Sequence, residues 1–232
     1  MLHRILLLSI LMTFAFTELS AQHFQSEWQS WTAIGLKKDF KKGFSIDAQY
    51  QIRFDHDIST FKASYLSAGL NYKLNKYLSF MVGYRFATNI HDDQHRFSAG
   101  IDLKYGKKKW DFDLRLVYQN DITSFNQHFL DYHQPNQNIR ARFTLSKTFK
   151  KHYEVYASCE PFIAISNKVT EISKIRNMIG FKYDFKKYHT LDIAYLFQPD
   201  VNTNHPTWTN ALNISYEFAL PKWRKFKGKK KA

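Results

Sequence analysis

The chain has 232 residues, of which 44% are hydrophobic and 17% aromatic, and its formal net charge is +14 at pH 7. The single cysteine excludes a framework of intrachain disulfides. Much of the positive charge falls in short lysine runs such as 37–38, 41–42 and 107–109. Because these runs separate predicted strands in an exported chain, they predict solvated turns and no nucleic-acid partner.

The first residues have the three-part layout of a secretory signal peptide. Residues 1–4 are a short basic start, residues 5–16 an apolar run, and residues 19–21 (Leu-Ser-Ala) a cleavage site before Gln22. The alternative is an anchoring helix, but the apolar run is shorter than the roughly 20 residues that span a bilayer. We predict a signal peptide over 1–21, a barrel over 22–220 and a basic periplasmic tail over 221–232, in a protein of the outer membrane.

Period-two alternation defines the predicted strands. Every even residue from 44 to 54 is apolar and every odd one is polar, which indicates a strand with two different faces. Including a less regular first segment, the segments in chain order are 28–40, 44–54, 66–74, 78–87, 96–105, 110–118, 139–149, 153–161, 175–185, 191–197 and 208–218. These are about eleven segments, but single-chain bacterial barrels have even strand numbers, so ten or twelve strands are expected. The predicted fold class is all-β, an antiparallel transmembrane β-barrel of about 10–12 strands.

Two features favour a membrane barrel over a soluble, lipocalin-like barrel with an apolar interior. Many segments run roughly 9 to 13 residues, as tilted strands that cross a bilayer do, whereas soluble strands average about 5 to 6. Aromatic residues also lie near segment ends on the apolar face, like interfacial girdles. They are Phe44, Phe54, Tyr72, Tyr105, Trp110, Tyr118, Phe149, Phe185, Trp208 and Phe218.

Connections alternate between tight, lysine-rich turns and longer polar loops, the longest at 119–137. Short turns face the periplasm in this class, which places the lysine turns there. The predicted partners are outer-membrane lipid and the barrel assembly machinery, for which Phe218 is the candidate terminal aromatic residue. The basic tail is a further candidate for contact with anionic headgroups or peptidoglycan.

Seven arginines between signal and tail fall on the lumen-facing parity of their segments, in the half nearer the long loops. They are Arg53, Arg85, Arg96, Arg115, Arg140, Arg142 and Arg176. The predicted acidic partners are Asp47, Asp102, Asp113 and Glu160; inward acids lie mostly nearer the short turns, with Glu160 the main exception. The arginines could be internal struts, because a small barrel fills its interior with side chains that pair or stay hydrated. They could also form a vestibule that attracts acidic small solutes, because a charged cleft focuses the field.

Residues for catalysis or metal binding are weakly supported. Ser64 and His95 have lipid-facing parity, as a barrel lipase needs, but no Gly-x-Ser-x-Gly elbow accompanies them. The groups His91 to His95 and His128 to His133 lack the spacing of a metal site. The sequence therefore predicts no enzyme, cofactor or metal. A lipid-modifying enzyme stands third, behind a channel or solute-binding barrel and a closed surface-interaction barrel.

Short motifs along the mature chain resemble the family designated domain of unknown function 2490. They are residues 28–36 with the basic turn that follows, Gly83-Tyr84-Arg85, Arg140-Ala141-Arg142, Glu160-Pro161-Phe162 and the stretch 176–180. The resemblance covers essentially the whole mature chain. It implies a barrel in the outer membrane and no assigned activity.

Overall fold

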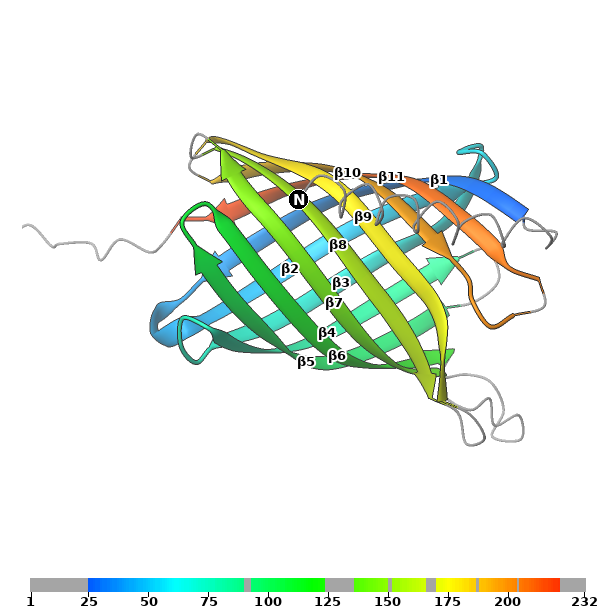
Figure 1. The fold of residues 1–232 in the computed structure, drawn as a ribbon, viewed down its shortest axis with the longest axis horizontal. Coiled ribbons are helices and arrows are strands. Elements are labelled where there is room, and N and C mark those ends of the chain that lie inside the picture. The colour runs from blue at the N-terminus through cyan, green and yellow to red at the C-terminus, as the bar shows by residue number, and fades with distance from the viewer. Residues whose placement is uncertain are drawn as a thin grey trace, which may run out of the picture.

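Eleven strands form one closed sheet in the computed structural model (Figure 1), which describes residues 25–89, 93–123, 136–149, 152–165, 170–186, 188–203 and 205–221. The strands are β1 (Gln25–Asp39), β2 (Phe44–Asp55), β3 (Thr60–Lys73), β4 (Leu78–Asn89), β5 (Asp93–Lys107), β6 (Trp110–Thr123), β7 (Asn136–Phe149), β8 (Tyr153–Ile165), β9 (Thr170–Lys186), β10 (His189–Pro199) and β11 (Thr207–Leu220). A short 3-10 turn, η2 (Lys41–Gly43), joins β1 to β2. Among the described residues, no helix is long and apolar enough to cross a membrane.

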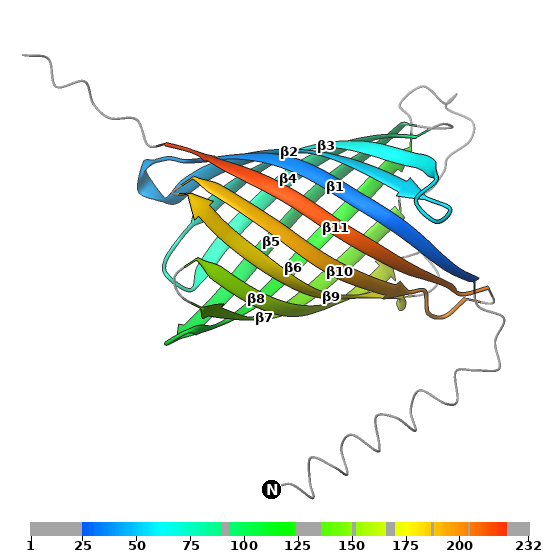
Figure 2. The ribbon, with the colours of Figure 1, turned by 90° about the horizontal axis from the view of Figure 1, so that it is seen from above.

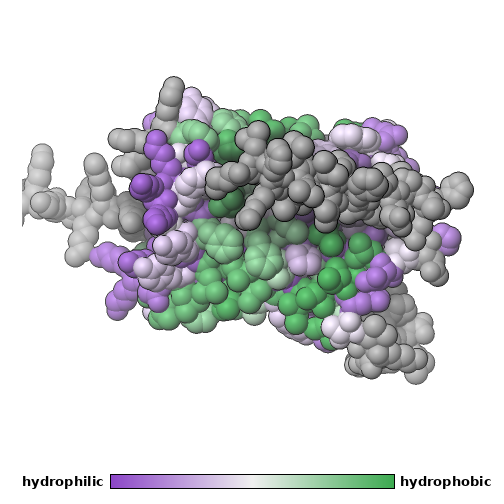
Figure 3. Space-filling model, in the orientation of Figure 1, coloured by the Kyte–Doolittle hydropathy of each residue, from purple (hydrophilic) through white to green (hydrophobic). Residues whose placement is uncertain are grey.

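The alternation along each strand sorts the side chains between two faces. On β2, Phe44, Ile46 and Tyr50 point outward and are 43–45% exposed. On the face that Figure 3 shows, apolar side chains gather across the middle of the barrel, with polar side chains toward both ends. An apolar surface of this extent is expected to face lipid rather than water. The predicted class, a transmembrane β-barrel, is therefore confirmed.

Barrel closure uses one parallel strand pair. Each strand pairs antiparallel with its sequence neighbour, but β1 pairs parallel with β11, from Gln25 opposite Thr207 to Lys38 opposite Leu220. The count of about eleven segments is therefore confirmed, and the preference for an even number is wrong. An odd strand number leaves the first and last strands running the same way, so they can close the sheet only in parallel. The start of β1 and the end of β11 consequently lie at opposite ends of the barrel (Figure 2).

The two ends of the barrel differ in their connections. The short-turn end carries the turns after β1, β3, β5, β7 and β9, and the long-loop end carries the others. In the first short turn Lys42 and Gly43 have φ of 60° and 83°. A Cβ at Gly43 would lie 2.5 Å from the Lys73 carbonyl oxygen, so a glycine fits this turn best.

The longest predicted loop, 119–137, is wrong in its bounds. Strand β6 continues to Thr123 and β7 begins at Asn136. The polar residues after Tyr118 suggested a loop, but Gln119 and Asp121 are 2% and 7% exposed inside the barrel. In the sequence, polar residues that point into a charged lumen therefore have the same pattern as polar residues of a loop. The signal peptide 1–21, tail residues 222–232 and loop residues His91, His128, Asp131 and His133 lie outside the described residues.

Candidate functional site

All seven arginines of the described residues line the interior of the barrel. They border four neighbouring spaces: a long-loop cavity of about 440 Å³, a central cavity of about 610 Å³, a short-turn cavity of about 760 Å³, and a wall niche of about 300 Å³ beside β2 to β7. Trp31, Arg53, Arg85 and Arg176 border both the long-loop and the central cavity. These four residues therefore mark the boundary between the two cavities.

Four arginines have carboxylate partners. Arg96 donates two hydrogen bonds to Asp121, from Nε at 2.5 Å and from a terminal nitrogen at 2.8 Å. Arg115 forms a similar two-point pair with Asp102. Glu160 is 2% exposed; it accepts from Arg140 at 2.8 Å and lies 3.6 Å from Arg176. Bidentate geometry of this kind fixes guanidinium groups and offsets their charge.

Arg53, Arg85 and Arg142 have no carboxylate within ion-pair distance among the described residues. Arg53 donates to the side-chain oxygen of Gln51, at 2.9 Å. Arg85 lies within electrostatic range of Arg53, Arg96 and Arg140, all of like charge. The Nε of Arg142 is buried and has no hydrogen-bond partner in the part of the chain described. Among the described residues, these three arginines therefore have no ion-pair partner inside the barrel.

Aromatic rings alternate with arginines around most of the lumen. In spatial order the groups are Arg85, Tyr65, Arg53, Trp31, Arg176, Phe162 and Arg140, and each guanidinium carbon lies 3.7–5.2 Å from the centroid of a neighbouring ring. We call this set the arginine–aromatic belt. A ring face attracts a cation without neutralising its charge. The belt therefore holds its arginines in place and leaves the lumen positive.

An apolar cluster narrows the same level of the barrel. Trp31 packs with Leu196 and Ala211, all 0–5% exposed, and Met178 lies against them. These side chains have inward parity on β1, β10, β11 and β9, so they fill space inside the barrel rather than outside it. The boundary between the two cavities is consequently apolar on this side and cationic on the other.

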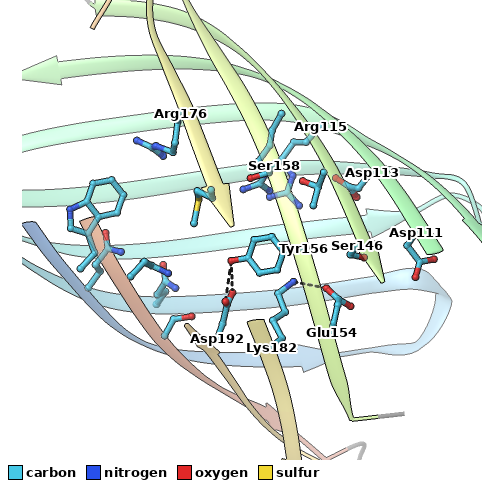
Figure 4. A pocket seen from close by; sticks show the side chains of 18 of the residues that line it. Asp111, Asp113, Arg115, Ser146, Glu154, Tyr156, Ser158, Arg176, Lys182 and Asp192 are labelled. Atoms are coloured by element: carbon cyan, nitrogen blue, oxygen red, sulfur yellow. Dashed lines mark hydrogen bonds and ion pairs between the residues drawn. The ribbon is translucent and has the colours of Figure 1, made fainter. Parts of the chain in front are cut away.

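The charge of the lining changes along the axis. Six basic and two acidic residues line the long-loop cavity, seven and four line the central cavity, and four of each line the short-turn cavity. The acids of the central cavity face its short-turn side (Figure 4). There the Tyr156 hydroxyl donates to Asp192 at 3.0 Å, and the Lys182 ammonium lies 3.1 Å from Glu154.

The predicted acidic partners divide into two pairs. Asp102 and Glu160 contact arginines, as described above. Asp47 instead accepts a hydrogen bond from Asn71 at 2.7 Å, and Asp113 lies 3.4 Å from the Lys104 ammonium. The partner of Arg96, Asp121, was missed because it fell in the predicted loop.

Two further differences concern strand position and aromatic side chains. Arg115 lies in the short-turn half of β6, because that strand extends beyond Tyr118. The inward rings of Trp31, Tyr65 and Phe162 were not selected from the sequence. Their parity alone could have identified them, since each falls in the polar series of its strand.

One group of possible metal ligands lies at the long-loop rim. Single ligand atoms of Glu27, Asp55 and His56 lie within 4.8 Å of one another. The Lys62 ammonium is 3.3 Å from Asp55 and 3.9 Å from Glu27, so a cation is already supplied by the chain. The hydrogen bond between Asp55 and the His56 ring raises the pKa of His56.

The two residues considered for catalysis lie on different strands. Ser64 belongs to β3 and His95 to β5. The His95 Nδ1 is 2.7 Å from the Tyr84 hydroxyl, and the ring packs beside Phe86. This aromatic setting is typical of the membrane-facing surface of a barrel.

A closed barrel with an outward apolar band and a charged lumen defines a transmembrane β-barrel. The model of the family described as "Protein of unknown function (DUF2490)" matches residues 28–210, and the chain belongs to this family. No curated protein matches the sequence.

Solved structures of two other barrel proteins are similar in fold. A bacterial polysaccharide outer membrane secretin is 11% identical, with 77% of this chain and 63% of that chain covered and a TM-score of 0.49. This chain thus spans less than two thirds of the secretin. The KdgM porin is 13% identical, with 74% and 83% covered and a TM-score of 0.46. Similarity at this level transfers no function.

Proposed function

We propose that this protein is an outer-membrane barrel whose lumen admits or binds small anionic solutes. The observation that carries the proposal is the set of three arginines inside the barrel, Arg53, Arg85 and Arg142, that have no ion pair with any described residue. Two of them, Arg53 and Arg85, border both the long-loop and central cavities. A solute moving between these cavities passes their guanidinium groups.

The net positive charge of the lining falls from the long-loop end of the lumen to the short-turn end, so the two ends should differ in their affinity for anions. A cleft that carries excess positive charge raises the local concentration of anions. With the long-loop end outside, as in barrels of known orientation, acidic solutes would meet the more positive end first. The fall in net charge toward the short-turn end weakens binding where a solute has to leave.

The test is single-channel conductance of the refolded mature chain in planar bilayers, with reversal potential measured in a salt gradient. We expect anion selectivity that falls in Arg53→Gln and Arg85→Gln. The matched control is Lys147→Gln, since its ammonium lies over the outward rings of Trp110 and Phe149. Cation selectivity, or selectivity that both arginine variants leave unchanged, would contradict the proposal.

The apolar cluster favours a second candidate function, a closed barrel. Leu196 and Ala211 have no exposed surface, and Trp31 is stacked between Arg53 and Arg176. If this cluster seals the lumen, recognition would fall to the long-loop end. A correctly folded barrel that stays silent in bilayers would support this function over the first.

A further inference from the structure

The arginine–aromatic belt has a gap between its two ends, Arg85 on β4 and Arg140 on β7. Within the described part of the chain, no aromatic ring bridges this gap, which is spanned by β5 and β6. The wall niche lies here, because its lining includes both terminal arginines of the belt and residues of the two strands between them.

Small residues hollow the wall at the niche. The register places Gly69 beside Gly83 and Gly83 beside Ser98, all with inward parity. A Cβ on Gly83 would lie 2.9 Å from the Ser98 hydroxyl oxygen, and one on Gly69 would lie 2.8 Å from the Asp47 carboxylate. The Asp47 carboxylate and the Ser98 hydroxyl therefore lie directly over these two glycines, in positions that a larger side chain would take.

Arginines lie on both sides of this hollow, toward the long-loop end and toward the short-turn end of the strands. Arg85 and Arg96 lie two residues nearer the long-loop end than Gly83 and Ser98. Arg140 and Arg142 lie on β7, and Arg142 pairs in register with Arg115. These five arginines line the niche, and among the described residues of its lining Asp47 alone is acidic.

Ion pairs offset three of these five charges. Arg96, Arg115 and Arg140 bind Asp121, Asp102 and Glu160, which leaves Arg85 and Arg142. The Arg142 Nε is a buried donor without a partner among the described residues, and leaving such a donor unsatisfied is costly. Two cations without an ion pair among the described residues, together with an unused donor, match a compact dianion, whose oxygens accept several hydrogen bonds.

We propose that the wall niche is a binding site for phosphate, either inorganic or as the phosphoryl group of a small solute, held between Arg85 and Arg142. This inference rests on the proposed function and deepens it, because it names the class of anion and the point where it binds. Inorganic phosphate fits the charge of the niche better than chloride, which carries one charge and no oxygen. Guanidinium groups are suited to phosphate by their planar, two-point geometry.

The test is calorimetric titration of the refolded, detergent-solubilised chain with inorganic phosphate in a chloride background. We expect saturable binding, with competition by sulfate. Replacing either cation, in Arg85→Gln or Arg142→Gln, should weaken the affinity by about tenfold or more, the usual effect of losing a hydrogen bond to a charged group. The control is Lys174→Gln, which removes a charge from the long-loop cavity but not from the niche.

The outcomes separate this site from the proposed function. The niche would be overturned as a phosphate site, even if the barrel conducts anions, by either of two results. One is that the wild-type chain does not bind phosphate; the other is that Lys174→Gln weakens phosphate binding as much as Arg142→Gln does. Saturable phosphate binding by a barrel that does not conduct would support the niche as a binding site and contradict a channel function. Competition by glycerol phosphate as strong as that by inorganic phosphate would identify the phosphoryl group of a larger solute as the ligand. The two arginines lie on different strands, so a folding defect in one variant leaves the other as the test.

Discussion

Glu160 is the residue whose loss should most disturb the interior of this barrel. Its carboxylate, 2% exposed, lies between Arg140 and Arg176. The substitution Glu160→Gln preserves the shape of the side chain and removes the charge. Two arginines whose side chains are 16% and 18% exposed then lose their common counter-ion.

The expected loss of stability is about 3 kcal/mol. Removing one partner of a buried ion pair costs about 3 to 5 kcal/mol, because the remaining charge stays buried. The lower figure applies here, since the amide oxygen of glutamine can still accept a hydrogen bond from Arg140. With a urea dependence of about 2 to 3 kcal/mol per M, the unfolding midpoint should fall by about 1 to 1.5 M.

The assay is reversible urea titration of folding into lipid vesicles, followed by tryptophan fluorescence, for which the chain has five tryptophans. The matched control is Asp113→Asn, because Asp113 lies 3.4 Å from a Lys104 side chain that is 59% exposed. An exposed pair of this kind contributes at most about 1 kcal/mol. If Glu160→Gln unfolds at the wild-type midpoint, water in the lumen screens these charges and the pairing described above is not structural. The same variant should increase anion selectivity, opposite to the arginine variants.

Three further predictions concern other parts of the barrel. Replacing Trp31 by alanine should raise conductance, because the ring narrows the boundary between the long-loop and central cavities; unchanged conductance would place the narrowest point elsewhere. Cys159, exposed on the outer face of β8, should react with a charged maleimide in the unfolded chain but not in vesicles, and rapid labelling in vesicles would contradict its contact with lipid. The His56 ring should titrate by NMR above its ordinary value of 6.5, since the charged form bonds to Asp55, so its stabilising effect is present at low pH and lost as pH rises through the raised pKa. Asp55→Asn should return the midpoint toward 6.5, and an unchanged midpoint would mean that the hydrogen bond is absent in solution.

Strand faces could be predicted from the sequence because alternation is a local property. Each arginine is one residue away from apolar neighbours that face lipid, so parity alone directed it into the lumen. The pairing of those arginines was less accessible, because it depends on register between strands. Asp121 contacts Arg96 only because β6 extends to Thr123, and polar residues inside a lumen resemble those of a loop.

The prediction of an even strand number was wrong, and the aromatic rings of the lumen were missed, for different reasons. Eleven predicted segments form an eleven-stranded barrel only if the first strand pairs with the last, and these two strands lie at opposite ends of the barrel sequence. No local pattern reports that contact. Trp31 was missed because β1 carries Trp28 on its outer face and Trp31 on its inner face, so aromatic content without parity does not reveal which ring points inward.

The parallel pairing of β1 with β11 also has a practical consequence for engineering. Because the first residue of β1 and the last residue of β11 lie at opposite mouths, a peptide linker joining them would have to pass through the lumen or through lipid. Circular permutation with a short linker is therefore ruled out for this barrel, although it suits even-stranded ones. In exchange, affinity tags attached before β1 and after β11 would stand in different compartments, and each could be reached by protease or antibody from one side of the membrane alone.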